Sequence, residues 1–346
     1  MESISAFLTW LNSYLWGPPM LVLLLGTHLF LTFRLRFVQR FIPLAIRISF
    51  GRHKEGEGDI SQFGALMTAL AATIGTGNIV GVATAVALGG PGAVLWTWLT
   101  GVFGIATKYS EALLAVKYRV RTSDGAMLGG PMYALERGLG ARWAGVMFAV
   151  FTAVAAFGIG NMVQANSISK VAHDVAGVSP WTSGVIMTLP TGMVILGGIR
   201  SIARVCERLV PFMAVSYVLG CLIVLALTAS SIPASIALIL KSALTGHAAA
   251  GGFAGATIMM AARFGIARGL FSNESGLGSV PIVAAAAQTK NPVRQALVSS
   301  TAPRRMSGRR PSARLRLSLR GNSGDSGPTD RQTANYLPPP LWLRCT

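Results

Sequence analysis

Charged residues are scarce in this chain of 346 residues, where Asp, Glu, Lys and Arg together make up 12% of the sequence. Soluble globular domains carry roughly a quarter of such residues. Hydrophobic residues account for 52% of the chain, and the mean hydropathy is +0.54. This balance excludes an ordinary soluble domain and predicts an all-α polytopic membrane protein.

Cysteine is rare too, and the chain lacks the residue patterns of metal-binding, disulfide-linked and enzymatic proteins. Its three cysteines, Cys206, Cys221 and Cys345, show no metal-binding spacing and make a disulfide framework improbable. The apolar runs hold no His/Glu or Ser/Lys pair with catalytic spacing, which disfavours a membrane enzyme. No basic segment precedes the first apolar run and no cleavage site follows it, so we expect that run to remain as a membrane span.

Apolar runs that approach or exceed the roughly 20 residues of a membrane-spanning helix recur along the chain. They predict seven crossings, at residues 16–33, 61–84, 89–116, 143–168, 180–198, 209–231 and 254–288. The segment 234–250 has an amphipathic pattern, so we expect it to lie on the membrane surface.

Lys and Arg residues give the orientation of these spans, because they collect in cytoplasmic loops. Sixteen basic residues follow the first, third, fifth and seventh runs, whereas two, Lys170 and Lys241, lie between the other runs. This asymmetry predicts that the N-terminus lies outside and residue 290 inside.

Two of the apolar runs are interrupted by glycine and small polar residues. The first interruption, AATIGTGNIVG, covers residues 71–81, and the second, GLFSNESGLGS, covers residues 269–279. Non-helical backbone at membrane depth has to be buried in protein or line a cavity, so paired interruptions indicate a secondary transporter with its site between repeats. The alternative is that the small residues only allow helices to pack closely.

Long segments around these interruptions resemble one known family. They read GDISQFGALMTALAATIGTGNIVGVATAVALGGPGAVLWTW (58–98), DGAMLGGPMYALERGLG (124–140) and GGFAGATIMMAARFGIARGLFSNESGLGSVPIVAAAAQTKNPVRQALVS (251–299). These segments closely resemble the alanine/glycine:cation symporter family, the sodium:alanine symporters of bacteria and archaea. The resemblance runs from about residue 10 to residue 299.

The resemblance implies a leucine-transporter-like inverted-repeat fold in a bacterial cell inner membrane, within the lipid bilayer. On this basis we expect an extra first helix and cytoplasmic loop in 1–60 and a first five-helix repeat in 61–232. A surface helix and the opening broken helix of an incomplete second repeat would occupy 233–299. The implied function is sodium-coupled import of a small neutral amino acid, alanine or glycine, by alternating access.

The last part of the sequence departs from the family pattern. Residues 301–346 contain nine Arg and no Lys, with many Ser, Pro and Gly residues. We expect a disordered tail in 300–346, read out of frame or left by a truncation, with no specific nucleic acid partner. The truncated chain is then expected to be inactive, and the alternative reading is a non-transporting membrane fragment.

The first interruption supplies groups for both an amino acid and Na+, the coupling ion that the resemblance implies; no cofactor is expected. Gly75 and Gly77 let the chain leave the helical path, so the amides of Thr76 and Gly77 are expected to bind the substrate carboxylate. The carbonyl oxygens of Thr73 and Ile74 and the side-chain oxygen of Asn78 are hard donors suited to Na+.

The second interruption and one further residue complete the expected substrate site. Phe271, Ser272, Asn273 and Gly276 would provide an apolar wall, hydrogen-bonding groups and backbone freedom, and Gln164 would contact the substrate from a third side. Gln164 could equally form an interhelical hydrogen bond.

Four charged residues near these segments form two pairs in the sequence. Glu274 and Arg268 flank the second interruption, where they take part in the site, pair with each other or lie at the mouth of a cavity. Lys108 and Glu111, three residues apart, are expected to form a helix-surface pair whose lysine reaches toward the membrane interface.

Overall fold

The computed structural model describes residues 2–49, 56–245 and 258–300. The tail that we expect to be disordered lies outside the described residues from position 301 onward, as do the last positions of the expected surface helix. Within the described ranges the chain is α-helical apart from one short β-hairpin. The prediction of an all-α membrane protein is therefore confirmed at the level of secondary structure.

Proline and glycine residues set many of the helix boundaries. Pro18, Pro131 and Pro180 each occupy the first helical position, where their missing N–H is not needed. The N-terminal part consists of α1 (Glu2–Leu15), α2 (Pro18–Arg34), the 3-10 turn η1 (Val38–Phe41) and α3 (Ile42–Ser49).

The first interrupted span forms two helices, α4 (Gln62–Thr73) and α5 (Thr76–Gly89). Ser61 caps α4, because its hydroxyl oxygen accepts a hydrogen bond from the Gly64 amide at 2.8 Å. Gly90, with φ +74°, ends α5 in a conformation that favours glycine, and α6 (Ala93–Lys117) begins three residues later. Residues 90–92 thus form the turn between the two helices.

The middle of the chain begins with a hairpin, β1 (Val120–Arg121) paired with β2 (Met127–Leu128) in antiparallel register. The elements that follow are α7 (Pro131–Gly138), α8 (Arg142–Phe157), the π-helical segment η2 (Gly158–Met162), α9 (Val163–Ala176), α10 (Pro180–Leu196), α11 (Gly198–Leu227), the 3-10 turn η3 (Ala229–Ser231) and α12 (Ile232–Thr245). The expected surface segment is therefore helical over its described part.

The second interrupted span forms α13 (Ile258–Asn273) and α14 (Ser279–Ala285), and α15 (Pro292–Ser300) follows. Between α13 and α14 the chain leaves the helical path, with positive φ angles at Glu274, Gly276 and Gly278. Both interruptions predicted from the sequence are thus real breaks between helices.

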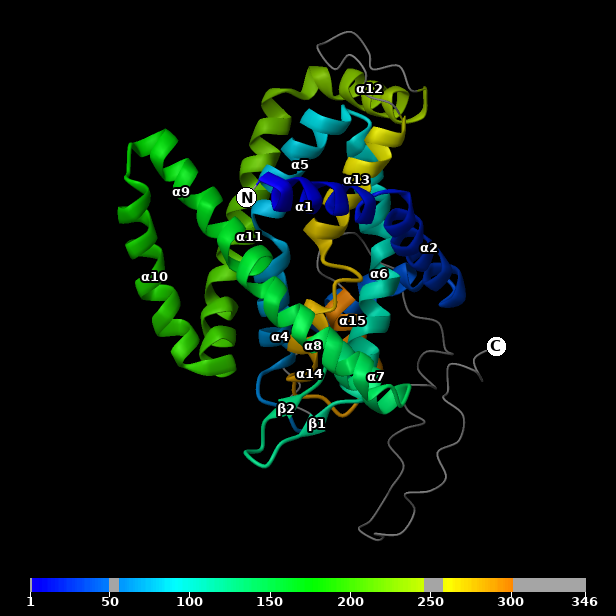
Figure 1. Ribbon diagram of the computed structural model, residues 1–346, viewed down its shortest axis with the longest axis vertical. Coiled ribbons are helices and arrows are strands. Elements are labelled where there is room, and N and C mark those ends of the chain that lie inside the picture. Colours follow the sequence, from blue (N-terminus) through cyan, green and yellow to red (C-terminus); the bar gives the residue numbers. More distant parts are fainter. Residues whose placement is uncertain (1, 50–55, 246–257, 301–346) are drawn as a thin grey trace. The chain divides into compact units, whose positions relative to one another are not determined.

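Helix α6 occupies a central place in the fold, in contact with α2, α13, α14 and α15 (Figure 1). Helix α13 packs along both α5 and α6, and α4 packs against α11 and α14. Small residues allow the close approach of α13 to α6: a Cβ added at Gly265 would lie 2.7 Å from the Trp96 Cβ. The two interrupted spans are therefore held against each other and against α6.

Four helical stretches of the described chain are long and apolar enough to cross a membrane, namely Ile4–Arg34, Gln62–Gly89, Arg142–Ala176 and Gly198–Leu227. They correspond to four of the seven expected crossings. Helix α10 is a shorter apolar helix of 17 residues, and α6 is long but carries Lys108, Glu111 and Lys117. The chain is a multi-pass membrane protein, and the full number of crossings stays a prediction.

Candidate functional site

The break between α4 and α5 consists of two residues, Ile74 and Gly75. Gly75 is extended, with φ −147° and ψ −155°, and it precedes the first helical residue of α5, Thr76. No side chain caps the N-terminus of α5. The amides of the first turn have no carbonyl partner within the helix, and they carry the positive end of the helix dipole.

Gly77 lies where α5 meets α13. A Cβ at position 77 would lie 3.3 Å from the Phe271 Cδ1 atom and 3.4 Å from the Ser272 Cα atom. The backbone of α5 can approach α13 this closely because residue 77 lacks a side chain. The structure therefore brings together three residues that the sequence analysis assigned to one site, from positions almost two hundred residues apart.

Asn78 links the first break to α13. Its Nδ2 atom donates a hydrogen bond to the Thr73 carbonyl across the break, and its Oδ1 atom accepts one from the Ser272 hydroxyl. The backbone N–H of Asn78 also donates to the Gly75 carbonyl at 3.1 Å. One asparagine thus closes the break in α4–α5 and attaches it to the second interrupted span.

Gln164 approaches the first break from α9. A Cβ at Gly75 would lie 3.9 Å from the Gln164 Oε1 atom. Gln164 is the second residue after η2, and single π-helical turns often occur at functional sites. Gln164 thus lies beside the first break, and its contact with a substrate stays a prediction.

Asn273 and Gly276, two other expected site residues, face a different part of the protein. The Asn273 Oδ1 atom accepts a hydrogen bond from the Ser275 amide at 3.0 Å, which satisfies a donor in the second break. The Gly276 amide donates to Glu111 Oε2 of α6 at 3.2 Å, and a Cβ at Gly276 would lie 3.8 Å from the His28 Cε1 atom of α2. Their contacts are to α2 and α6 rather than to α5.

Lys108 corrects one expectation from the sequence. It is only 2% exposed, so it does not reach toward a membrane interface. Its Nζ atom has no hydrogen-bond partner among the described residues, and the charged groups that act on it are Glu274 and Glu111. Amphipathic spacing could not reveal this, because the same spacing suits an exposed helix-surface pair.

Arg268 and Glu274 do not form an ion pair with each other in the described part of the chain, where the ion pairs are Arg121–Glu57, Arg142–Glu136 and His173–Asp174. Glu274 instead accepts a hydrogen bond from the Ser279 hydroxyl at 2.8 Å, across the second break. The pairing alternative from the sequence analysis is therefore wrong.

A second group of contacts joins the start of α4 to the end of α14, and the sequence analysis missed it. Asp59 and Ile60 donate backbone hydrogen bonds to the Ala286 carbonyl, and the Gln288 amide donates to the Ile60 carbonyl. These contacts form a short parallel bridge between Ile60 and Ala287. The segments flanking the two interrupted spans are thus joined by backbone pairing.

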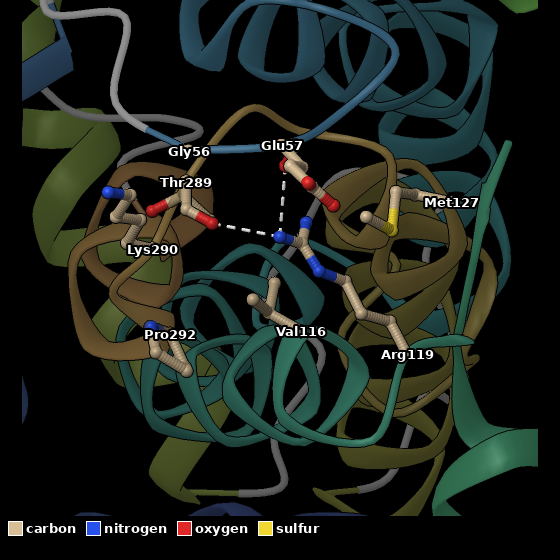
Figure 2. Close-up of a pocket in the computed structure, with 8 residues that line it drawn as sticks. All are labelled: Gly56, Glu57, Val116, Arg119, Met127, Thr289, Lys290 and Pro292. Carbon is tan, nitrogen blue, oxygen red and sulfur yellow. Dashed lines mark hydrogen bonds between the residues drawn. The ribbon is translucent and has the colours of Figure 1, made fainter. Parts of the chain in front are cut away.

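Arg119, just after α6, lies at the centre of this junction. Its guanidinium donates to four backbone carbonyls, those of Ala285, Ala287, Glu57 and Thr289, at 2.8–3.0 Å. Figure 2 shows Arg119 beside a cavity of about 420 Å³, with its hydrogen bonds to Glu57 and Thr289. Burial lowers the pKa of Arg119, and the negative charges of Glu57 and Asp59 oppose that effect.

The geometry defines a class of protein before any relative is considered. The chain is a helical multi-pass membrane protein in which two interrupted spans meet at Asn78 and Ser272. The chain belongs to the sodium:alanine symporter family, whose family model matches residues 1–304.

Individual relatives agree with this assignment. A protein of Methanococcus maripaludis named sodium/alanine symporter AgcS is 54% identical over 297 residues, which cover 84% of this chain and 65% of that protein. An uncharacterized transporter of Haemophilus influenzae is 53% identical, and the match covers 86% of this chain and 66% of that protein. The probable sodium/glutamine symporter GlnT of Bacillus subtilis is 39% identical, and the match covers 84% of this chain and 60% of that protein. The chain therefore spans slightly less than two thirds of these relatives' length.

Proposed function

We propose that this chain forms the substrate and Na+ site of a secondary transporter that imports a small neutral amino acid, alanine or glycine, by alternating access. The observation that carries the proposal is the meeting of the two interrupted spans, where Asn78 of α5 binds both the Thr73 carbonyl and the Ser272 hydroxyl. Membership of the sodium:alanine symporter family supports the same function.

The proposed architecture is the leucine-transporter-like inverted repeat. In this arrangement α4–α5 opens the first repeat and α13–α14 opens the second, so that the breaks of both spans lie at the site. We further propose that the protein resides in the bacterial inner membrane with its N-terminus outside, as the distribution of Lys and Arg predicts.

The substrate carboxylate is proposed to bind at the N-terminus of α5. The amides of Thr76 and Gly77 begin an uncapped helix, and such amides attract anions through hydrogen bonding and the helix dipole. Phe271 packs against Gly77 and offers an apolar wall for a small side chain. Ser272 and Gln164 provide oxygen atoms within reach of the substrate ammonium.

Na+ is proposed to bind the carbonyl oxygens of Thr73 and Ile74 together with Asn78 Oδ1. In the structure Asn78 turns its Nδ2 atom to Thr73 and its Oδ1 atom to Ser272. Binding of Na+ between Thr73 and Asn78 requires the side-chain amide to rotate, after which Nδ2 donates to the Ser272 hydroxyl oxygen. The ion would thus change the hydrogen bonding of a substrate-site residue on α13, which gives a direct route for coupling.

Two other functions remain as alternatives to test. A non-transporting membrane fragment would insert and bind weakly or not at all, and a membrane enzyme would consume its substrate. The family assignment favours transport over catalysis.

Uptake of radiolabelled alanine into proteoliposomes that contain the purified chain tests the proposal. Accumulation that requires an inward Na+ gradient and is competed by unlabelled glycine supports symport. Correct insertion without uptake contradicts import by this chain and supports the alternative, a non-transporting membrane fragment. Binding of alanine to the detergent-solubilised protein, measured with and without Na+, then shows whether the site itself forms.

A further inference from the structure

One face of α6 lies against the second break. Gly104, Thr107, Lys108 and Glu111 recur at helical spacing and so share this face. Gly104 makes room for the segment 274–278, because a Cβ there would lie 2.8 Å from the Ser275 Oγ atom. The break therefore rests on a surface that α6 provides.

Polar contacts fix the segment to this face at two places. Glu111 accepts a hydrogen bond from the Gly276 amide at 3.2 Å, and its carboxylate also interacts with the Gly278 amide. Next to it, Thr107 is hydrogen-bonded to His28 Nδ1 of α2 at 2.7 Å. Two amides of the break, those of Gly276 and Gly278, thus find a carboxylate on α6.

Lys108 is the positive charge among these groups. It is 2% exposed, and the negative charges of two carboxylates act on it: Glu274 within the break and Glu111 on its own helix. A buried charge is costly unless opposite charges lie near it, and two neighbouring carboxylates would repel each other without a cation. The opposite charges that act on the Lys108 ammonium are those of Glu274 and Glu111, and neither carboxylate pairs directly with it among the described residues.

We propose that Lys108 and Glu111 are positioning residues for the substrate site: they hold the second break against α6 and so fix Ser272 and Phe271 opposite Gly77. Lys108 balances the two carboxylates, and Glu111 binds the backbone of the break. The effect of Lys108 and Glu111 on substrate binding rests on the proposed function. Their effect on the position of the second break does not.

The position of the break can be measured without any transport. Ser275 is 2% exposed and packs against Gly104, so a Ser275→Cys variant places a thiol at the contact between the break and α6. The three natural cysteines are first replaced by alanine. The rate of alkylation of Cys at this position by a membrane-permeant maleimide then reports how often the segment leaves α6.

Four variants of Lys108 and its neighbours test the proposal on this background. Lys108→Met should raise the alkylation rate about tenfold, whereas Lys108→Arg, which keeps the charge, should stay within about twofold. Glu111→Gln should raise the rate as well, because the backbone amides lose a charged acceptor. The double variant Lys108→Met/Glu111→Gln restores the formal charge of the group and should label more slowly than Lys108→Met alone, a result that loss of packing cannot give.

Two controls define the contrary results. Lys117→Met changes an exposed lysine of the same helix and should leave the rate unchanged, and Ser49→Cys reports on a buried site in α3. An unchanged rate in Lys108→Met overturns the proposal. An equal rise at Ser49→Cys overturns it too, because Lys108 would then support the whole fold rather than this segment.

Alanine binding to the same detergent-solubilised variants adds the functional readout. If the parent protein binds alanine, Lys108→Met should weaken binding about tenfold and Lys108→Arg should restore it. Altered alkylation in a protein that does not bind alanine would leave the positioning role in place and refute the proposed function. Unaltered alkylation refutes the positioning role whatever the protein binds.

Discussion

Replacement of Arg119 by alanine should destabilise the protein, because it removes the hydrogen bonds that join two segments of the chain. The guanidinium donates to four carbonyls, at 2.9 Å to Ala285, 2.8 Å to Ala287, 3.0 Å to Glu57 and 2.8 Å to Thr289. Each hydrogen bond from a charged donor contributes about 1.5–3 kcal/mol. A simple sum would nevertheless exceed the true loss, because the adjacent cavity of about 420 Å³ lets water reach some of the carbonyls.

We therefore expect Arg119→Ala to lower the free energy of unfolding by about 3 kcal/mol, roughly the value of one or two such bonds. For a chain of this size that loss corresponds to a midpoint of thermal unfolding lower by about 6 °C. The midpoint of thermal unfolding of Arg119→Lys should lie between those of the unchanged protein and of Arg119→Ala. An ammonium has three donors on one atom and cannot span four carbonyls on two segments.

Arg121 provides a matched control two residues away. It pairs with Glu57 at 3.1 Å, but both side chains are largely exposed, at 59% and 67%. Exposed ion pairs contribute about 0–1 kcal/mol, so Arg121→Ala should shift the midpoint by less than about 2 °C. The midpoints are measured by heating the detergent-solubilised variants and following the monodisperse fraction. If Arg119→Ala and Arg121→Ala have the same midpoint of thermal unfolding, the four hydrogen bonds do not hold the junction.

Three further predictions concern the interrupted spans. Gly77→Leu should abolish alanine binding while membrane insertion persists, because a side chain there would collide with Phe271 and Ser272; normal binding would remove α5 from the site. Asn78→Ala should raise the Na+ concentration for half-maximal alanine binding more than it changes alanine affinity at saturating Na+, and an unchanged Na+ dependence would place the ion elsewhere. Gly269→Ala should lower stability by about 1–3 kcal/mol through overpacking against Thr100, and adding Thr100→Ala should recover part of that loss in the same thermal assay.

The two breaks were predictable because glycine and small polar residues inside apolar runs have few other uses. Gly75 takes an extended conformation within the break that its sequence context indicated, and Gly276 and Gly278 adopt positive φ angles as their residue type allows. The contact between Asn78 and Ser272 was not predicted, because the sequence analysis assigned Asn78 to Na+ and Ser272 to the substrate. Its partners lie 194 residues apart, and the sequence does not contain the geometry that joins them.

The roles of Lys108 and Arg119 could not be predicted, for different reasons. Lys108 has the same spacing to Glu111 whether the face of α6 meets lipid headgroups or protein, and only the packing of α13 and α14 on α6 decides between these. Arg119 was one of many basic residues beyond a span, and its partners are backbone carbonyls, which leave no mark in the sequence. A charged side chain that binds backbone can be recognised only once the fold is known.

The two breaks are held by different chemistry, and this difference bears on how the protein would work. The first break is closed by neutral groups, the Asn78 amide and the Ser272 hydroxyl, whose hydrogen bonds can be exchanged for an ion at little cost. The second break is held by charges on α6, which are costly to separate inside a protein. Ligand binding should therefore rearrange the first break more readily than the second. In that case α4 and α5 would move relative to a fixed assembly of α6, α13 and α14, and the junction at Arg119 would be the contact that such a movement has to break.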